Sequence, residues 1–188
     1  MDGDLALLFD SAWCPDPVPD GYDGCLAYAG GTSASHAWTQ AELDRVAHLP
    51  RLVTWVPTPG ADSPRHAAAS FRQWLGDHGV PARHDEPRVH VLWDLETGRE
   101  PDPAWVSTAC DYLRSAGYDN LIYGSPGWVL GQPRRAGYLV ANPTGVPHLY
   151  QAPGVVGTQY AWNVPVAGGV IDQDVIVRRL LRRLWQPA

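Results

Sequence analysis

Positive charge is scarce in this sequence, and lysine is absent altogether. All 14 basic residues are arginines, and 20 acidic residues leave a formal net charge of −6. A protein that binds nucleic acid or an anionic membrane surface needs a basic stripe that faces the phosphates. We therefore expect neither nucleic acid nor a charged membrane among the partners of this protein.

Long apolar runs are missing as well. None approaches the roughly 20 residues that a membrane-spanning helix requires. The sequence begins with the acidic segment Met1-Asp2-Gly3-Asp4, where a signal peptide would be basic. Because 45% of the residues are hydrophobic, the chain can still bury a core. We expect a folded protein with no membrane span and no signal peptide.

Cysteine and clustered histidine, the common zinc ligands, are also sparse. Cys14, Cys25 and Cys110 form no CxxC pair, and the seven histidines form no HxH or HExxH motif. We therefore expect no metal and no cofactor. Cys14 and Cys25 can bridge the proline-rich segment between them in an oxidising setting; otherwise all three thiols stay reduced.

Tryptophan, in contrast, is abundant, with nine residues in the chain. Its flat apolar face and single N–H donor suit both a hydrophobic core and a surface that stacks on sugars. We expect most of the nine in the core, including Trp74 and Trp105, which lie on amphipathic segments. The others are candidates for contact with a saccharide.

Short apolar runs alternate with amphipathic stretches along most of the chain. The runs predict eight strands, at residues 5–10, 25–29, 52–56, 89–96, 121–124, 138–141, 157–161 and 170–172. Capping signals predict helices from Thr39 to about His48, from Ser63 to Gly79 and from Asp102 to Ala116. Arginines in the last turns indicate a further helix from about Asp174 to Trp185. The segments between the last three strands are short and rich in glycine and proline.

Strands that alternate with helices pair in parallel, and eight of them favour a closed barrel. A complete (β/α)₈ barrel takes about 250 residues, so a chain of 188 residues must omit some helices. We predict one α/β domain over residues 1–188, an irregular TIM-type barrel of about five βα units followed by three strands with few helices. The alternative is an open doubly wound sheet, but no GxGxxG or P-loop follows any strand.

In such barrels the functional residues lie at the carboxyl ends of the strands. The predicted strand ends carry acidic, aromatic and amide side chains: Asp10, Trp55, Asp94, Glu96, Tyr123, Gln159, Trp162 and Asp172. Carboxyl groups at one rim raise one another's pKa, and a fold retains such a cluster where it is used. Alternatively, Asp10 and Asp172 only cap the turns that follow them.

Asp94-Leu95-Glu96 is the most informative triplet. Residues i and i+2 of a strand share a face, with Cα atoms roughly 6.5–7 Å apart. Two carboxyl groups at this spacing do not both ionise at their usual pKa, so Asp94 and an apolar wall are expected to raise the pKa of Glu96. One protonated acid beside one carboxylate is what glycoside hydrolysis needs, with carboxyl groups about 5–9.5 Å apart.

Five segments together resemble a known family. They are the strand ending at Asp10, the segments Val91-Leu92-Trp93-Asp94-Leu95-Glu96 and Leu121-Ile122-Tyr123-Gly124-Ser125, and the later segments Gly157-Thr158-Gln159-Tyr160-Ala161-Trp162 and Gly169-Val170-Ile171-Asp172-Gln173-Asp174. The last two are similar to a "WQY" strand and a terminal "VDxN" element. The chain resembles the glycoside hydrolase family 25 lysozymes, and most closely the related glycoside-hydrolase-like domains of unknown function from actinobacteria and their phages.

The resemblance implies a function and a role for each site residue. The implied substrate is the β-1,4 bond after N-acetylmuramic acid in peptidoglycan. Glu96 is implied to protonate the leaving oxygen, and Asp94 to stabilise the positive charge at the sugar carbon or to orient the substrate's N-acetyl group. Asp10 and Asp172 are implied to line the floor and tune these two acids. The implied substrate-binding residues are Tyr28, Trp55, Tyr123, Gln159, Tyr160 and Trp162.

Two departures from the family pattern leave a second function open. The second strand, Leu26-Ala27-Tyr28-Ala29-Gly30-Gly31, lacks the family's lysine-threonine-acid signature, and a proline-rich loop replaces the first helix. The alternative is an idle barrel that binds glycans or serves as a structural module, for example in a phage virion beside other virion proteins. A phage protein needs no export signal. We expect it either to stay in the cytoplasm until lysis releases it, or to be virion-associated or extracellular. A third function, that of a metal-dependent hydrolase, is not supported, because this sequence lacks the clustered histidines that would bind the metal.

Overall fold

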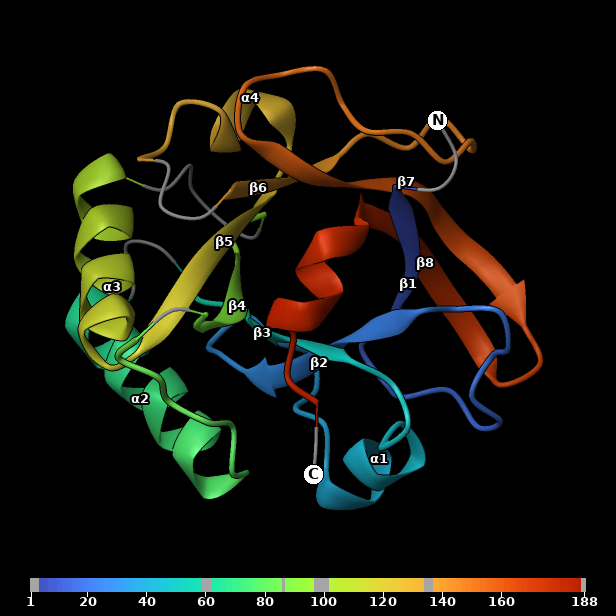
Figure 1. The fold of residues 1–188 in the computed structure, drawn as a ribbon, viewed down its shortest axis with the longest axis horizontal. Helices are drawn as coiled ribbons and strands as arrows, with labels where there is room; N and C mark the ends of the chain where they lie inside the picture. The colour runs from blue at the N-terminus through green and yellow to red at the C-terminus, as the bar shows by residue number, and fades with distance from the viewer. Residues whose placement is uncertain (1–3, 59–61, 86, 97–101, 134–136, 187–188) are drawn as a thin grey trace.

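The computed structural model describes residues 4–58, 62–85, 87–96, 102–133 and 137–186. Eight strands form a closed barrel in which each strand pairs with its neighbour along the chain, and the last closes on the first (Figure 1). The predicted irregular TIM-type barrel is confirmed. The strands are β1 (Leu5–Asp10), β2 (Gly24–Gly30), β3 (Arg51–Trp55), β4 (Val89–Asp94), β5 (Tyr118–Gly124), β6 (Gly137–Ala141), β7 (Val155–Val166) and β8 (Gly169–Val177).

Strand β8 runs against both of its neighbours. Strands β1 to β7 pair in parallel, whereas β8 pairs antiparallel with β7 and with β1. Only Ala167 and Gly168 separate β7 from β8. Such a short connection joins antiparallel strands, because parallel strands need a long crossover. The expectation of parallel pairing is therefore wrong for the last strand.

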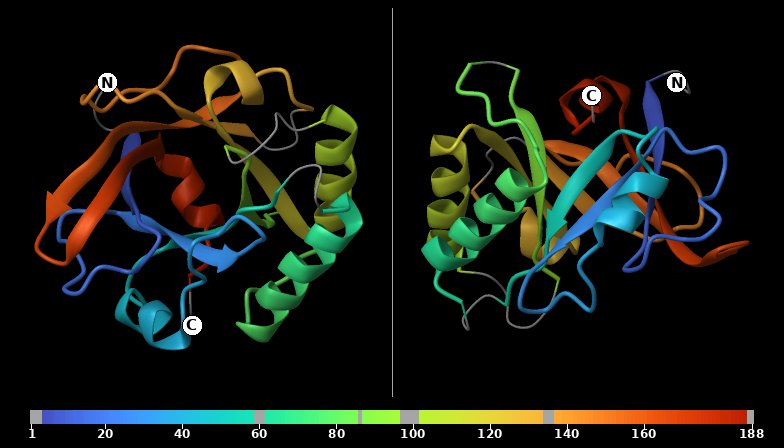
Figure 2. Two further views of the ribbon diagram at one scale, coloured as in Figure 1. Left: turned by 180° about the vertical axis from the view of Figure 1, so that it is seen from behind. Right: turned by 90° about the horizontal axis from the view of Figure 1, so that it is seen from below.

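Of the four α-helices in the described residues, two cover one flank of the barrel, and the other two lie elsewhere around it (Figure 1). The second and third helices pack side by side, as both views of Figure 2 show. Three helices begin after the predicted caps Thr39, Ser63 and Asp102, whose side chains each accept a backbone N–H. As the proline-rich sequence indicated, no helix separates β1 from β2. The helices are α1 (Gln40–Arg45), α2 (Pro64–Asp77), α3 (Pro103–Ser115) and the short α4 (Pro126–Val129).

The C-terminal segment differs from its prediction. Residues 174–177 continue β8, and only the 3₁₀ helix η1 (Arg178–Arg183) follows. The branched residues Val175, Ile176 and Val177 favour a strand, and pairing with both β1 and β7 keeps them extended. Helix η1 lies at the end of the barrel where β1 begins (red in Figure 1).

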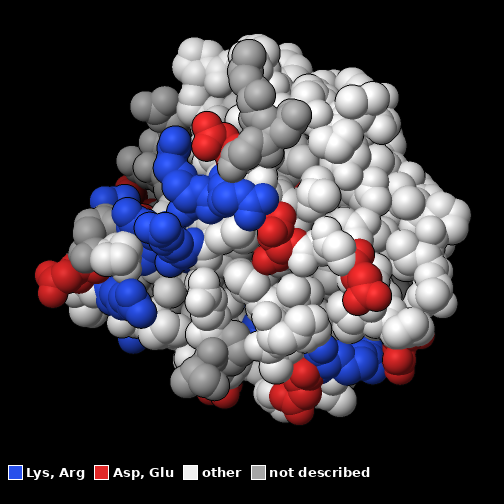
Figure 3. All heavy atoms as spheres, turned by 45° about the vertical axis from the view of Figure 1, so that its right-hand side comes forward, with Lys and Arg blue, Asp and Glu red and all other residues white. Residues whose placement is uncertain are grey.

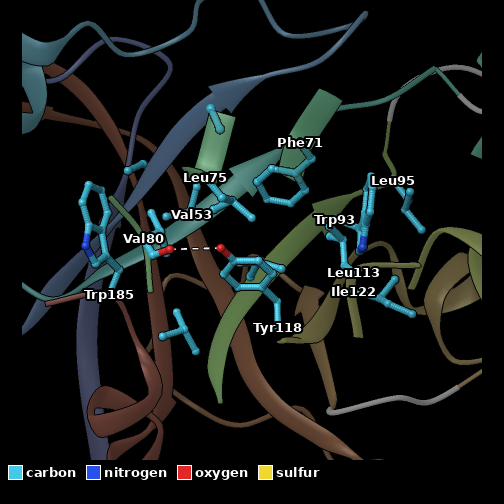
Figure 4. Close-up of a cluster of buried hydrophobic side chains, with 14 of the residues drawn as sticks. Val53, Phe71, Leu75, Val80, Trp93, Leu95, Leu113, Tyr118, Ile122 and Trp185 are labelled. Carbon is cyan, nitrogen blue, oxygen red and sulfur yellow. Dashed lines mark hydrogen bonds between the residues drawn. The ribbon is translucent and has the colours of Figure 1, made fainter. Parts of the chain in front are cut away.

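Alternate residues of the strands build two apolar layers. The layer inside the barrel consists mainly of leucines, with two residues from the C-terminal segment among them: Leu8, Leu26, Leu52, Leu92, Leu121, Leu139, Leu180 and Leu184. Outside the barrel, the ring of Trp93 of β4 packs edge-on against Phe71 of α2, and Leu75 belongs to the same buried cluster (Figure 4). Trp74 and Trp105 pack in the outer layer, as predicted. Because Leu92 points into the barrel, Asp94 two residues later points the same way.

Charge is unevenly distributed over the surface. Figure 3 shows arginine side chains gathered in one area, with acidic residues beside them. A hollow of about 240 Å³ at the η1 end of the barrel is lined by Arg83, Arg88, Arg182 and Arg183. In the described part of the chain, no helix has both the length and the apolar character needed to cross a bilayer.

Candidate active site

Three strands bring acidic side chains together at one end of the barrel. Asp10 closes β1 and Asp94 closes β4, and Glu96 follows two residues later. Asp172 lies directly opposite Asp10 in the ladder between β1 and β8. Since β8 is antiparallel, Asp172 reaches this end near the start of its strand and not at its close. The four predicted acids thus lie close together, and we call Asp10, Asp94, Glu96 and Asp172 the carboxyl cluster.

Gln159 of β7 connects members of this cluster. Its side-chain N–H donates to Asp10 Oδ2 and to Asp172 Oδ2, each at 3.4 Å. Its Oε1 accepts the hydroxyl of Tyr123 at 2.6 Å and the indole N–H of Trp162. A neutral amide therefore holds two acids and two aromatic side chains in place without adding charge.

Asp10 holds its proton more tightly than an ordinary aspartate. Burial raises its pKa well above the usual value, and the charges of Asp172 and Asp94 add to the rise. The hydroxyl of Tyr28 donates to Asp10 Oδ2 at 3.1 Å and offsets part of this effect. Asp10 Oδ1 is buried without a hydrogen-bond partner in the described part of the chain. Tyr28 thus contacts the cluster from β2.

The chain turns between Asp94 and Glu96. Strand β4 ends at Asp94, and the backbone N–H of Glu96 donates to Asp94 Oδ1 at 3.1 Å. The expectation that Glu96 continues the strand is therefore wrong, because the Asp94 side chain accepts the N–H that a strand would present to its neighbour. Asp94 is only 8% exposed, whereas Glu96 is exposed to solvent. A substrate at the mouth can reach Glu96 directly.

Both acids of this triplet have raised pKa values. Burial raises the pKa of Asp94 to about 7, the Glu96 N–H offsets part of the rise, and the Glu96 charge adds to it. Although solvent reaches Glu96, loss of water around its carboxyl group raises its pKa, hydrogen bonding with Tyr123 lowers it in part, and the charge of Asp172 raises it. The charge that acts on Glu96 thus comes from Asp172, where the sequence indicated Asp94.

A fifth carboxyl group, that of Asp174, lies within the barrel wall, where the sequence predicted the start of a helix. Asp174 is fully buried and pairs with Leu8 of β1 and Gln159 of β7. Neither carboxyl oxygen has a hydrogen-bond partner among the described residues. Burial and the charge of Asp10 raise its pKa well above the usual value. The i, i+2 spacing of Asp172 and Asp174 is the sequence signal that predicts a shared strand face.

The aromatic residues divide into three groups. Trp162 is 51% exposed, as predicted, whereas Tyr123 and Tyr160, which were also expected to be partly exposed, are 4% and 5% exposed. Tyr123 belongs to the layer inside the barrel and offers the site its hydroxyl, not a stacking face. Trp55 stacks on Phe71 of α2, on the outer side of the barrel. Its neighbour Thr54 occupies the alternate position, so strand alternation explains why Trp55 faces the helix.

Gly124 at the end of β5 keeps space open beside Glu96. It has φ +155°, and an added Cβ would lie 3.0 Å from Val129 Cγ1 and 3.6 Å from Glu96 Cγ. We expect Gly124→Ala to lower the free energy of unfolding by roughly 1–3 kcal/mol, because the methyl group is overpacked and the backbone is strained. Urea unfolding measures this change. Gly127→Ala is the control: its Cβ meets nothing within 4 Å, and an equal loss there would contradict the explanation.

A large hollow lies elsewhere on the barrel and does not contain the carboxyl cluster. A hollow of about 570 Å³ lies between the start of β1 and the end of β8, where Asp4, His148 and Arg178 line it. It is at the end of the barrel away from the carboxyl cluster, and Arg178 there is paired with Asp23 at 3.1 Å. In the part of the chain that the structure describes, no three histidine, cysteine, aspartate or glutamate side chains are placed to hold a metal ion.

Solved structures show the same fold at low sequence identity. An uncharacterized protein of B. stearothermophilus matches with a TM-score of 0.74 and 18% identity, covering 96% of this chain and 100% of its own. The catalytic domain of endolysin ply40 from bacteriophage P40 of Listeria monocytogenes matches with a TM-score of 0.73 and 12% identity, covering 97% and 98%. A muramidase from Acremonium alcalophilum matches with a TM-score of 0.62 and 14% identity, covering 94% and 97%.

Sequence comparison alone finds no relative. No family model matches the chain, and no curated protein matches it. The structural likeness therefore establishes the fold, which this chain shares with an endolysin catalytic domain and a muramidase, and leaves the activity to be argued from the site.

Proposed function

We propose that this protein is a glycoside hydrolase that cleaves β-1,4 bonds of peptidoglycan, and that residues 1–188 act as one barrel domain. The observation that carries the proposal is the exposed acid Glu96 beside the buried acid Asp94, with Asp10 and Asp172 in the same cluster. Glycosidases use two carboxyl groups whose different surroundings keep one of them protonated and the other ionised. The shared fold with an endolysin catalytic domain and a muramidase supports the same function.

In this proposal Glu96 is the general acid. Its proton passes to the glycosidic oxygen as the bond from that oxygen to the sugar carbon breaks, and the remaining Glu96 carboxylate then takes a proton from the attacking water. Its exposure favours this role, because the donor has to reach the leaving oxygen of a bound chain. Asp94 cannot approach as closely, since it is buried and one oxygen accepts the Glu96 N–H.

Asp94 stabilises the positive charge that develops at the sugar carbon, or orients the N-acetyl group of the substrate for internal attack. With a pKa of about 7, Asp94 is half protonated at neutral pH. If the ionised form of Asp94 is the active one and protonated Glu96 is the donor, ionisation of Asp94 raises the rate of cleavage as the pH rises, and ionisation of Glu96 lowers it. Gln159 hydrogen bonds with Asp10 and Asp172, and the charge of Asp172 helps to raise the pKa of Glu96. Trp162 offers an exposed face to the sugar.

The proposal is tested with purified bacterial cell walls. We expect the protein to lower the turbidity of a wall suspension and to release new reducing ends, with muropeptides identified by mass spectrometry. A protein that is retained on walls but releases no reducing ends over a long incubation would instead be the idle barrel, a glycan-binding or structural module. An association with other virion proteins belongs to that second reading.

A further inference from the structure

An exposed aromatic pair lies beside the mouth of the barrel, outside the carboxyl cluster. Trp13 is 57% exposed, and its ring stacks on that of His36 with the centroids 5.3 Å apart and the planes within 10°. Trp13 and Trp162 are the two exposed tryptophans of the nine, all of which the structure describes. Tryptophan is enriched where proteins contact other molecules, because it offers a large apolar face together with one N–H donor.

The loop that carries Trp13 is fixed by side chains from the region of α1. The indole N–H of Trp38 lies 3.2 Å from the carbonyl oxygens of both Ser11 and Ala12. Arg45 donates to the carbonyl of Cys14 at 2.9 Å. The backbone on both sides of Trp13 is therefore held in place, so the exposed indole does not have to be ordered when a ligand arrives.

Glu42 fixes both halves of the stacked pair. Its carboxylate accepts the backbone N–H of Cys14 at 3.1 Å, next to Trp13, and lies 2.8 Å from His36 Nε2. Although burial alone would raise it, hydrogen bonds from Thr39, His36 and Cys14 hold the pKa of Glu42 down to about 2. Glu42 is thus ionised at neutral pH and in mild acid.

The topology places this pair at the same end of the barrel as the carboxyl cluster. Trp13 lies in the loop after β1 and His36 in the loop after β2, and these strands run parallel. Trp13 is three residues beyond Asp10, so its Cα lies within about 10 Å of that of Asp10. A glycan chain that occupies the mouth can extend over this distance.

We propose that Trp13, held face to face with His36, forms a saccharide subsite that receives a sugar ring of the same glycan chain, away from the bond that is cleaved. His36 covers one face of the indole, and the uncovered face stacks on the apolar face of the sugar. The subsite deepens the proposed function: it sets how long a glycan chain has to be for full affinity.

The test measures binding of β-1,4-linked N-acetylglucosamine oligomers of three and six sugars by calorimetry, with the protein carrying Glu96→Gln so that no chain is cut. We expect Trp13→Ala to weaken binding of the six-sugar oligomer about 3- to 10-fold and to leave the three-sugar oligomer nearly unchanged. Trp13→Phe should retain most of the affinity. In the active protein, which keeps Glu96, Trp13→Ala should raise KM on long glycan chains with little change in kcat.

Trp74→Ala is the matched control, because Trp74 also stacks on a histidine, His78, at 3.9 Å, but near the far end of α2. Equal loss in Trp74→Ala and Trp13→Ala would overturn the proposal, as would equal loss for both oligomers. A change of oligomeric state in Trp13→Ala with unaltered glycan affinity would mark an interface between copies instead, which also overturns it.

A failure of the proposed hydrolysis gives a different result. If the wild-type protein binds the six-sugar oligomer through Trp13 but releases no reducing ends, the subsite stands and the hydrolysis is wrong. If Trp13→Ala changes neither the binding of the oligomers nor the retention of the protein on whole walls, the proposed subsite is wrong.

Discussion

Glu96→Gln is expected to lower kcat/KM on purified peptidoglycan by about 10²- to 10⁴-fold, while binding of the glycan persists. Glutamine keeps the size of the side chain and can still hydrogen bond with Tyr123, but it has no proton to give to the leaving oxygen. Because Glu96 is exposed and the variant removes a charge from a crowded cluster, we expect no loss of folding stability. Release of reducing ends over time measures the rate, and the midpoint of thermal unfolding checks the fold.

Asp85→Asn is the control for this change. Asp85 is exposed in the loop between α2 and β4, at the other end of the barrel, and its loss of charge should leave the rate unaltered. The informative comparison is with Asp94→Asn. If Asp94→Asn is inactive and Glu96→Gln retains most of the rate, then Asp94, whose pKa is about 7, is the proton donor and the proposed roles are reversed.

Asp174→Asn is expected to stabilise the protein at pH 8, by roughly 1–3 kcal/mol, because it removes a fully buried carboxyl group that has no hydrogen-bond partner. For a chain of this size that gain raises the unfolding midpoint by about 2–12 °C. Asp10, whose charge raises the pKa of Asp174, then ionises more easily in the variant.

The gain should depend on pH in a defined direction. The folded protein binds the protons of Asp10, Asp94 and Asp174 more tightly than the unfolded chain does, since the pKa of each is raised. The contribution of these three groups to stability is therefore largest below about pH 4, the usual aspartate pKa, and falls as the pH rises above it, for Asp94 until about pH 7. Asp174→Asn should reduce this fall without abolishing it, because Asp10 and Asp94 still titrate.

Unfolding midpoints between pH 4 and pH 8 test this expectation. Asp85→Asn, an exposed aspartate changed in the same way, should follow the wild-type curve. Two results would show that the buried carboxyl group of Asp174 does not destabilise the protein. One is a wild-type midpoint that is constant over this range, and the other is an Asp174→Asn curve that coincides with that of Asp85→Asn.

Much of this site could be predicted from local sequence. The apolar run before Asp10 and the run before Asp94 are long enough to specify strands, and strands in a barrel direct their carboxyl ends to one rim. The capping box of Thr39 and Glu42 predicted the start of α1 correctly. In each case the deciding interactions lie within a few residues of one another, so the sequence pattern contains them.

Asp172 was placed correctly for an incorrect reason. Its apolar run was interpreted as a parallel strand that closes on an acid, yet β8 is antiparallel and continues to Val177. The residues after Asp172 carry both a helical charge pattern and branched apolar side chains, so local propensity is divided. Pairing with β1 on one side and β7 on the other decided the matter, and those partners are distant in sequence.

The sequence by itself determined the positions of the strands, their order along one barrel and the acids that end β1 and β4, because period-two burial and capping act over short distances. Only the tertiary structure decided which aromatics are exposed to solvent and in which direction the pKa of each acid is shifted. Tyr123 and Tyr160 are buried and Trp13 is exposed, although all three follow or belong to similar strands. Burial, hydrogen-bond partners and neighbouring charges set these properties, and they come from residues as far apart as Asp10 and Gln159.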